Sequence, residues 1–385
     1  MADLQNAIQT LLDELVESGE EMGLQAAVYI EGQLVADCFA GWRSQDRETL
    51  VSKDTLFTVY SCTKGVVASA VHILAERGII DYERPVTEYW PEFAEAGKGS
   101  VTVAQALNHL AGIPQTIQIK GKSTSEIWAN LDLCVAEVAR LKPIFPPGST
   151  ACYHGLTFGW IVEGIVRGVG RSLSEVVAEE IARPLHIGDE MYLGTPASEH
   201  GRMATPFEKP PTGELPEIDP LVLRCVPLPD LVEALNQPEV RSSQVAAGNM
   251  STTAQALARH YAALVGEVDG CRLVSETHLE RVFSHRSDLP DVTLQRLVTV
   301  LPQETPRAGG YQMNTGRRDQ IMYYGPNPRT FGHNGYGGSF GCADPDAKVA
   351  LGYTKTLLHT ELIREPFSEK SFSEKRFIEM VYGNL

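Results

Sequence analysis

A short extended stretch runs directly into a long apolar helix at Ser61, and this joint constrains the fold more than any other part of the sequence. Residues 57–78 read FTVYSCTKGVVASAVHILAERG. The run after Ser61 is apolar over most of its length, as in a helix buried inside a protein, and Gly78 suits the glycine that commonly ends a helix. We therefore expect this helix to be deeply buried.

Strand and helix patterns lie at both ends of the chain, and helical patterns fill the middle. An amphipathic helix is predicted near the N-terminus, followed by a β-hairpin over 24–41 that turns at Glu31-Gly32-Gln33. A second hairpin is predicted over 338–356, turning at 344–347, and a last helix lies near Phe377. At 385 residues the chain exceeds what one hydrophobic core comfortably fills. We predict an α/β (α+β) lobe formed by residues 1–80 and 246–385, interrupted by a mostly helical lobe over 81–245, with a cleft between them for a small molecule.

Three local patterns complete this outline. Residues 172–185 predict a helix with Ser172 or Ser174 as its N-cap. Residues 206–238 contain eight prolines, which predict an irregular excursion without a packed helix, at the rim of the pocket. Residues 251–265 predict a helix with Ser251 as its N-cap.

Ser61 and Lys64 are three residues apart at the start of the apolar helix, so their side chains share one face. A buried ammonium loses hydration, its pKa falls, and the neutral amine becomes a base able to activate a serine hydroxyl. The helix N-terminus favours negative charge that develops beside it. From these residues alone a second interpretation stays open, in which Ser61 is an N-cap and Lys64 extends its ammonium to solvent.

The same stretch resembles the serine β-lactamase and penicillin-binding-protein fold, of which S-x-x-K is a signature. The resemblance continues, in the family's order, through VTVAQALNHLAGIP, FPPGSTACYHG, GNMSTTAQALARHYAAL and FGHNGYGGSFGCADPDAKVALGY. It is closest to the family VIII carboxylesterases, which are built on the class C β-lactamase fold. It implies a β-lactamase-like antiparallel sheet flanked by helices, with an inserted helical lobe.

Carried over by motif, Ser61 matches the acylated nucleophile and Lys64 its partner, while Tyr153 matches the tyrosine between them that acts as general base and then acid. Two cationic neighbours can lower a phenol's pKa towards the working range, so we expect an acidified Tyr153. Whether Lys64 or Tyr153 takes the first proton stays open.

The resemblance also implies that His333-Asn334-Gly335 lines the substrate site and that the backbone N–H groups of Ser61 and Tyr336 form the oxyanion hole. Two positions depart from the β-lactamase pattern. Gly155 stands where those enzymes have an asparagine that binds the substrate amide, and His333 replaces their cationic lysine. A site lacking both favours neutral esters over penicillins.

A second serine motif is misleading. Residues 337–341, GGSFG, fit the nucleophile elbow of α/β-hydrolases, but only 46 residues follow Ser339 and they contain one histidine, His359. The flanking residues predict a hairpin and not strand-turn-helix, so we reject this elbow.

Composition excludes several other classes. A net charge of −16 argues against nucleic acid or an anionic membrane as a partner, and no apolar run is long enough to span a membrane. Seven cysteines without a CxxC pair predict reduced thiols, and with the acidic N-terminal segment they favour a cytoplasmic protein. No metal-ligand spacing occurs, and no cofactor is expected.

The expected function is that of a serine carboxylesterase cleaving small or medium-chain carboxylic esters through an acyl-Ser61 intermediate. Three alternatives stay open: an acyltransferase of the same fold, a peptidase, amidase or weak β-lactamase, and a non-catalytic scaffold. The expected partner is a small-molecule ester, and the sequence does not indicate an oligomeric state.

Overall fold

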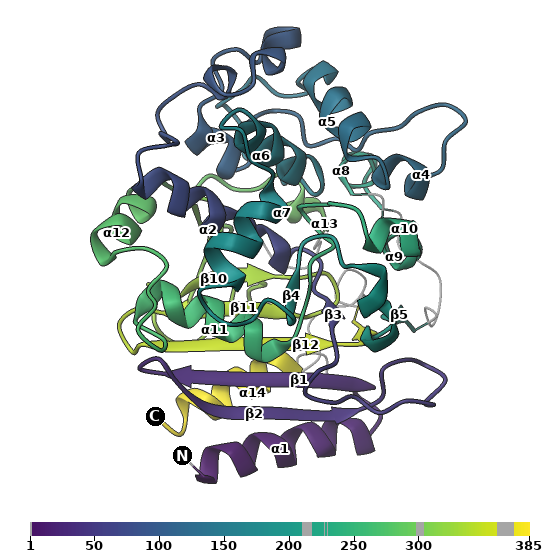
Figure 1. The fold of residues 1–385 in the computed structure, drawn as a ribbon, viewed down its shortest axis with the longest axis vertical. Helices are drawn as coiled ribbons and strands as arrows, with labels where there is room; N and C mark the ends of the chain where they lie inside the picture. Colours follow the sequence, from purple (N-terminus) through teal and green to yellow (C-terminus); the bar gives the residue numbers. More distant parts are fainter. Residues whose placement is uncertain (1, 210–217, 227, 229, 298–303, 360–372) are drawn as a thin grey trace.

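The computed structural model is built around one antiparallel sheet (Figure 1). The structure describes residues 2–209, 218–226, 228, 230–297, 304–359 and 373–385. In spatial order the strands are β2 (Gln33–Gly41), β1 (Gly23–Ile30), β12 (Val349–Lys355), β11 (Phe340–Asp344), β10 (Phe331–Asn334), β9 (Tyr311–Met313), β8 (Arg307–Ala308) and β7 (Arg286–Ser287). The first hairpin of the chain thus pairs with its last long strand, Ile30 facing Val349.

Both predicted hairpins are confirmed. The first turns at Glu31 and Gly32, whose φ angles of 50° and 78° suit the tight turns that join twisted strands. The second joins β11 to β12, and Asp344 caps its turn by accepting hydrogen bonds from the backbone N–H groups of Asp346 and Ala347, each at 3.0 Å.

Helices cover both faces of the sheet. The predicted N-terminal and C-terminal helices, α1 (Ala2–Glu17) and α14 (Ser373–Tyr382), are confirmed and share one core with alternate residues of β1. On the other face lie α11 (Ala254–Val265) and α2 (Cys62–Glu76). Figure 1 shows α11 in front of the strands and α14 behind them.

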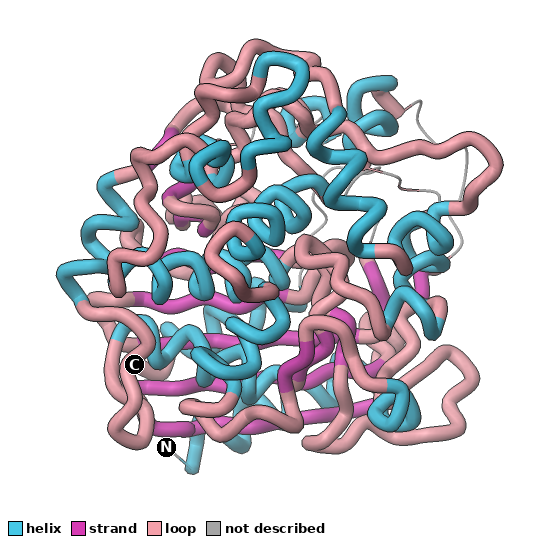
Figure 2. The backbone as a smooth tube through the Cα atoms, turned by 45° about the horizontal axis from the view of Figure 1, so that its top comes forward, coloured by secondary structure: helices cyan, strands magenta, loops and turns pink. Residues whose placement is uncertain are grey.

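The predicted burial of the helix after Ser61 is confirmed: every residue of α2 from Cys62 to Ala75 is buried, and Gly78 follows its end at a φ of 71°. This helix packs on β10 on one side and on α6 (Thr157–Arg167) on the other. It therefore joins the sheet to the helical part, which Figure 2 shows gathered on the side away from the two termini.

The helical part is built from short elements. They are η1 (Val86–Glu88), η2 (Pro91–Gly97), α3 (Val103–Leu107), α4 (Thr124–Trp128), α5 (Leu131–Arg140), α6, α7 (Leu173–Val176), η3 (Val177–Ala182), η4 (Ala197–Arg202), α8 (Pro220–Cys225), α9 (Leu231–Asn236) and α10 (Pro238–Arg241). Later helices are α12 (Glu276–Ser284) and α13 (Leu294–Leu297), and short strands are β3 (Phe57–Thr58), β4 (Met191–Tyr192), β5 (Phe207–Glu208), β6 (Ser251–Thr252) and β13 (Leu357–Leu358). The division into lobes at residues 80 and 245 stays a prediction.

The structure corrects two local predictions and sharpens a third. The region 206–238 is not free of packed helices: α8 and α10 each begin at a proline, which the first helical position tolerates because its N–H has no partner within the helix. Residues 210–217, 227 and 229 of that region lie outside the described residues. Ser251 is not an N-cap but part of β6, and Thr253 caps α11 by accepting from Ala256 N at 3.0 Å. Of the two serines considered for the helix over 172–185, Ser172 is the cap.

Candidate active site

Ser61 lies at the N-cap of α2, immediately after a strained residue. Tyr60 has a φ of 47°, a left-handed conformation that a bulky side chain rarely adopts. The side chain of Thr63 fixes this joint: its hydroxyl donates to Tyr60 O and accepts from Met250 N at 3.1 Å. Strain at such a joint is common where a side chain must be presented to a ligand.

Lys64 contacts Ser61 and is fully buried. Its Nζ lies 3.1 Å from Ser61 Oγ and 2.8 Å from each of two carbonyl oxygens, those of Gly155 and Ala247. Burial holds the pKa of the Lys64 amine well below its ordinary value, and the charge of Arg307 lowers this pKa further. A neutral amine has two N–H donors and one lone pair. The two carbonyls accept the two N–H groups, so the lone pair is left for the hydroxyl of Ser61.

Tyr153 is the third side chain at the site, beside Ser61 and Lys64. Its hydroxyl donates to Ser61 Oγ at 2.7 Å, and its ring centroid lies 4.8 Å from Lys64 Nζ. The structure thus brings the three sequence-predicted side chains together, within hydrogen-bond distance of Ser61.

The expectation of an acidified phenol is wrong. Burial raises the pKa of Tyr153 above its ordinary value, and the hydrogen bond to Ser61 and the charge of Arg307 offset only part of that rise. The amine of Lys64 beside it is held neutral, and His333, which replaces the lysine of β-lactamases, is neutral as well. Tyr153 therefore rests as a protonated hydrogen-bond donor.

The end of β10 runs close to the Ser61 joint. A Cβ added at Gly335 would lie 2.4 Å from Val59 O, and the rings of Tyr336 and Tyr60 are 5.8 Å apart. This approach is compatible with an oxyanion hole formed by the N–H groups of Ser61 and Tyr336. The side chain of Tyr336 is fixed by its hydroxyl, which donates to Glu208 at 2.5 Å.

His333 lies in the interior. Its side chain is fully buried, with its ring centroid 6.4 Å from that of Tyr153. Burial holds its pKa well below the ordinary value, so the imidazole is neutral. The neighbouring Asn334 is half-buried, and its backbone N–H donates to Gln312 Oε1 at 2.9 Å. His333 therefore supplies no positive charge where β-lactamases have lysine.

The structure adds two residues that the sequence analysis missed. Arg307 and Asp291 form a buried ion pair behind Tyr153, with Arg307 Nη2 3.3 Å from Asp291 Oδ2. Neither belongs to a motif. Only the pairing of β8 into the sheet and the return of residue 291 to the Tyr153 backbone bring them to the site.

Ser339 is no nucleophile elbow. It lies in the turn between the antiparallel strands β10 and β11, so a strand and not a helix follows this serine. The residue is fully buried and its hydroxyl has no hydrogen-bond partner among the described residues.

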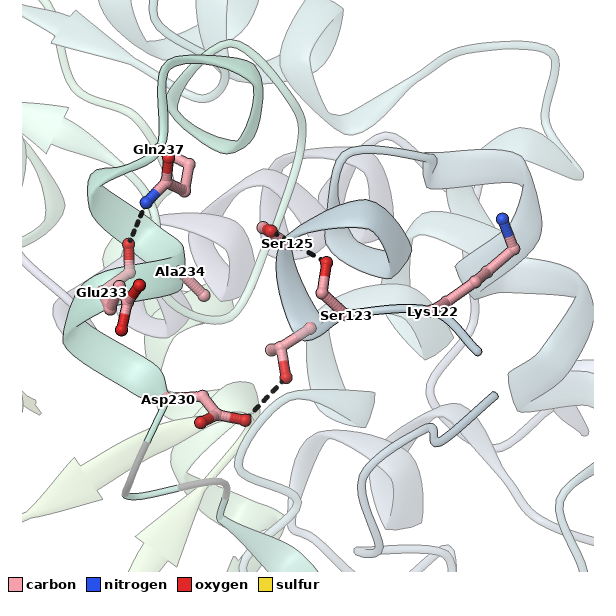
Figure 3. A pocket seen from close by; sticks show the side chains of 8 residues that line it. Lys122, Ser123, Ser125, Asp230, Glu233, Ala234 and Gln237 are labelled. Carbon is pink, nitrogen blue, oxygen red and sulfur yellow. Dashed lines mark hydrogen bonds between the residues drawn. The ribbon is translucent and has the colours of Figure 1, made fainter. Parts of the chain in front are cut away.

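A separate pocket of about 280 Å³ lies between α4 and α9 (Figure 3). Its lining is polar, and Thr124 Oγ1 donates to Asp230 Oδ2 across it at 2.9 Å. It includes none of the residues around Ser61. Within the described ranges no cluster of three or more His, Cys, Asp or Glu could hold a metal ion, and no helix there is long and apolar enough to cross a membrane.

Comparisons with known proteins agree with this fold. The family model described as Beta-lactamase matches residues 8–365. The esterase/beta-lactamase LipL of Mycobacterium tuberculosis is 33% identical over 358 residues, covering 88% of this chain and 76% of LipL. The crystal structure of a family VIII carboxylesterase superposes with a TM-score of 0.86 at 30% identity, covering 99% of this chain and 98% of that one. A penicillin-binding protein homolog from Caulobacter crescentus gives a TM-score of 0.81 at 31% identity, covering 100% and 98%.

Proposed function

The chain belongs to the β-lactamase family, and we propose that within it the protein is a serine carboxylesterase that cleaves small or medium-chain carboxylic esters. One observation carries the proposal: the buried Lys64 Nζ lies 3.1 Å from Ser61 Oγ and 2.8 Å from each of two carbonyl oxygens, so that a neutral amine donating to both carbonyls turns its lone pair towards Ser61. This arrangement supplies a base to a hydroxyl that is otherwise a poor nucleophile.

Acylation proceeds in three proton transfers. Ser61 Oγ attacks the ester carbonyl while its proton passes to Lys64, and the negative charge develops on the carbonyl oxygen beside the N–H groups of Ser61 and Tyr336. Tyr153 then donates its proton to the departing alkoxide and is reprotonated by Lys64. The alcohol leaves with the proton of Tyr153, the proton from Ser61 ends on Tyr153 by way of Lys64, and the acyl group stays on Ser61.

Deacylation runs the same relay in reverse. Water takes the place of the alcohol and gives a proton to Tyr153 as its oxygen attacks the acyl carbon, while the proton of Tyr153 moves to Lys64. Ser61 Oγ then leaves and recovers a proton from Lys64, which restores the neutral amine and the protonated phenol. No step draws on a metal or an organic cofactor.

The shape of the site supports esters over β-lactams. A Cβ at Gly155 would lie 3.0 Å from Cys225 O, so the asparagine of β-lactamases has no room here without a shift of the backbone. The buried, neutral His333 offers no charge to a substrate carboxylate. The name of the esterase EstB of Burkholderia gladioli, 26% identical over 54% of this chain, supports the same substrate class, and the name of LipL includes both esterase and beta-lactamase.

The test is intact-mass analysis after brief exposure to a panel of nitrophenyl esters. We expect an acyl adduct on the wild type and none on Ser61→Ala, while Ser339→Ala retains the adduct. An adduct that survives in Ser61→Ala would identify another nucleophile.

The alternatives are separated by turnover. Hydrolysis of a nitrophenyl ester should exceed that of a chromogenic cephalosporin, and faster cephalosporin turnover would instead indicate a β-lactamase. A large excess of transfer to an added alcohol over hydrolysis would indicate an acyltransferase. Failure of folded protein to react with a fluorophosphonate would favour a scaffold.

We also infer a cytoplasmic location. All seven cysteines are free thiols and six of them are buried, as expected of a protein that folds in a reducing compartment. Fractionation of the native cells would test this.

A further inference from the structure

The ion pair behind Tyr153 is almost completely buried. Arg307 is 2% exposed and Asp291 not at all. The other carboxylate oxygen of Asp291 accepts from three backbone N–H groups, those of Tyr153, Thr293 and Leu294, at 3.0–3.1 Å. Arg307, by contrast, has no hydrogen-bond partner for Nε or Nη1 among the described residues.

The pair is oriented with its positive end towards the site. The guanidinium carbon lies 5.2 Å from the centroid of the Tyr153 ring, while Asp291 is held at the backbone of the same residue. The effects of the two charges on the pKa values of neighbouring groups follow this orientation. Arg307 lowers the pKa of Tyr153 more than Asp291 raises it, and it also lowers the pKa of Lys64.

The other titratable groups around Lys64 and Arg307 carry no charge at neutral pH. Burial lowers the pKa values of the nearby histidines and raises those of the nearby thiol and phenol. These groups are His109, His154, His333, Cys62 and Tyr324. Arg307 is therefore the permanent cation among these neighbours, and Asp291 is its counterion.

We propose that Arg307, held in place by Asp291, is a positioning residue whose fixed charge sets the electrostatic field in which Lys64 and Tyr153 exchange protons. β-lactamases carry a positive charge at the strand position that His333 occupies here. In this protein Arg307 supplies that charge from β8. This inference rests on the proposed esterase function, because it assigns a role within the same proton relay.

The test is direct titration of Lys64 by NMR in protein labelled with ¹³C at lysine Cε, with the signal assigned by Lys64→Met. The isosteric neutral pair Asp291→Asn/Arg307→Gln removes both charges, and Arg307→Lys keeps the positive one. From the Coulomb interaction across a protein interior, we expect the Lys64 midpoint to rise by about one pH unit in the neutral pair. It should stay near the wild-type value in Arg307→Lys.

Ester hydrolysis gives the second readout. The acid limb of the kcat/KM profile should move to higher pH in the neutral pair, so that activity on this limb falls about tenfold at a given pH, with a smaller loss on the plateau. The matched control is Glu163→Gln/Arg167→Gln, which removes another ion pair with a buried carboxylate, on α6, and should leave the Lys64 midpoint unchanged.

Two outcomes would overturn the proposal: an unchanged Lys64 midpoint in the folded neutral pair, or an equal rise in Arg307→Lys. If the neutral pair does not fold, Asp291→Asn alone decides the question. That variant leaves Arg307 unopposed, so the midpoint must fall, and an unchanged or higher midpoint refutes the role. The titration needs no turnover. A wild type that cleaves no ester would thus reject the esterase function, while the Lys64 midpoint still tests Arg307.

Discussion

Alanine at position 335 should push the end of β10 away from Ser61. The new Cβ would lie 2.4 Å from Val59 O and 3.2 Å from Cys62 Sγ, and ordinary contacts begin at 3.4 Å. The segment after β10 and the segment around Ser61 must therefore separate by about 1 Å. A misplacement of this size can lower the rate about 10²-fold. The φ of Gly335 is not in the left-handed region, so alanine adds no backbone strain of its own.

The separation acts on the proposed oxyanion hole, because Tyr336 follows Gly335 directly. Losing one such donor costs about 10²–10³ in kcat, or about 3–4 kcal/mol. We expect Gly335→Ala to lose activity by this factor in kcat for nitrophenyl ester hydrolysis, with KM changed only a few-fold. Thermal unfolding should show that the protein is still folded.

Gly188→Ala is the matched control, since a Cβ there meets no atom within 4 Å and its φ also lies outside the left-handed region. It should keep wild-type activity. The reasoning is refuted if folded Gly335→Ala retains activity within about threefold of the wild type, or if Gly188→Ala loses as much.

Three further predictions follow from the same structure. Tyr153→Phe should lower kcat by about 10²–10⁴ because the relay loses its proton donor, whereas Tyr311→Phe, a buried hydroxyl away from Ser61, should change kcat little in the same assay. A pH profile of kcat/KM should rise through the lowered pKa of Lys64 and then stay level, and a rise near 10.5 instead would show an ordinary lysine. Burial raises the pKa of Asp37 from 3.8 to about 6, so its ionisation destabilises the fold above that pH and not below 3.8. Asp37→Asn should therefore gain up to about 3 kcal/mol in denaturant unfolding at pH 8 and almost nothing at pH 3.5, and equal gains at both would contradict the assignment.

Local patterns predicted the parts of the site that depend on local geometry. Ser61 and Lys64 meet because residues three apart on a helix share a face, and this follows from sequence spacing alone. The hairpin at Glu31-Gly32 is likewise set by the residues of its turn. Tyr153 required the family resemblance, because nothing in its own neighbourhood separates it from the chain's other tyrosines.

What the sequence did not predict depends on contacts between distant segments. Arg307 and Asp291 reach Tyr153 through the sheet and a returning loop, so no spacing rule connects them. The pKa of Tyr153 was misjudged because its burial outweighs the charge beside it, and burial is a property of the assembled core. The prolines of 206–238 predict a segment without helix, but Pro220 and Pro238 each occupy the first helical turn, which accepts proline.

The pairing of β1 with β12 also determines when the protein can fold during synthesis. Because Ile30 pairs with Val349, β1 cannot pair with β12 until residue 349 has been synthesised. At typical translation rates this synthesis takes roughly 15–60 s. Throughout that interval one edge of the early hairpin has no strand beside it, and such an edge readily pairs with other chains. A ribosome that stalls or stops between these strands therefore releases a fragment that tends to aggregate, which is a greater hazard to a cell than a fragment that is only inactive.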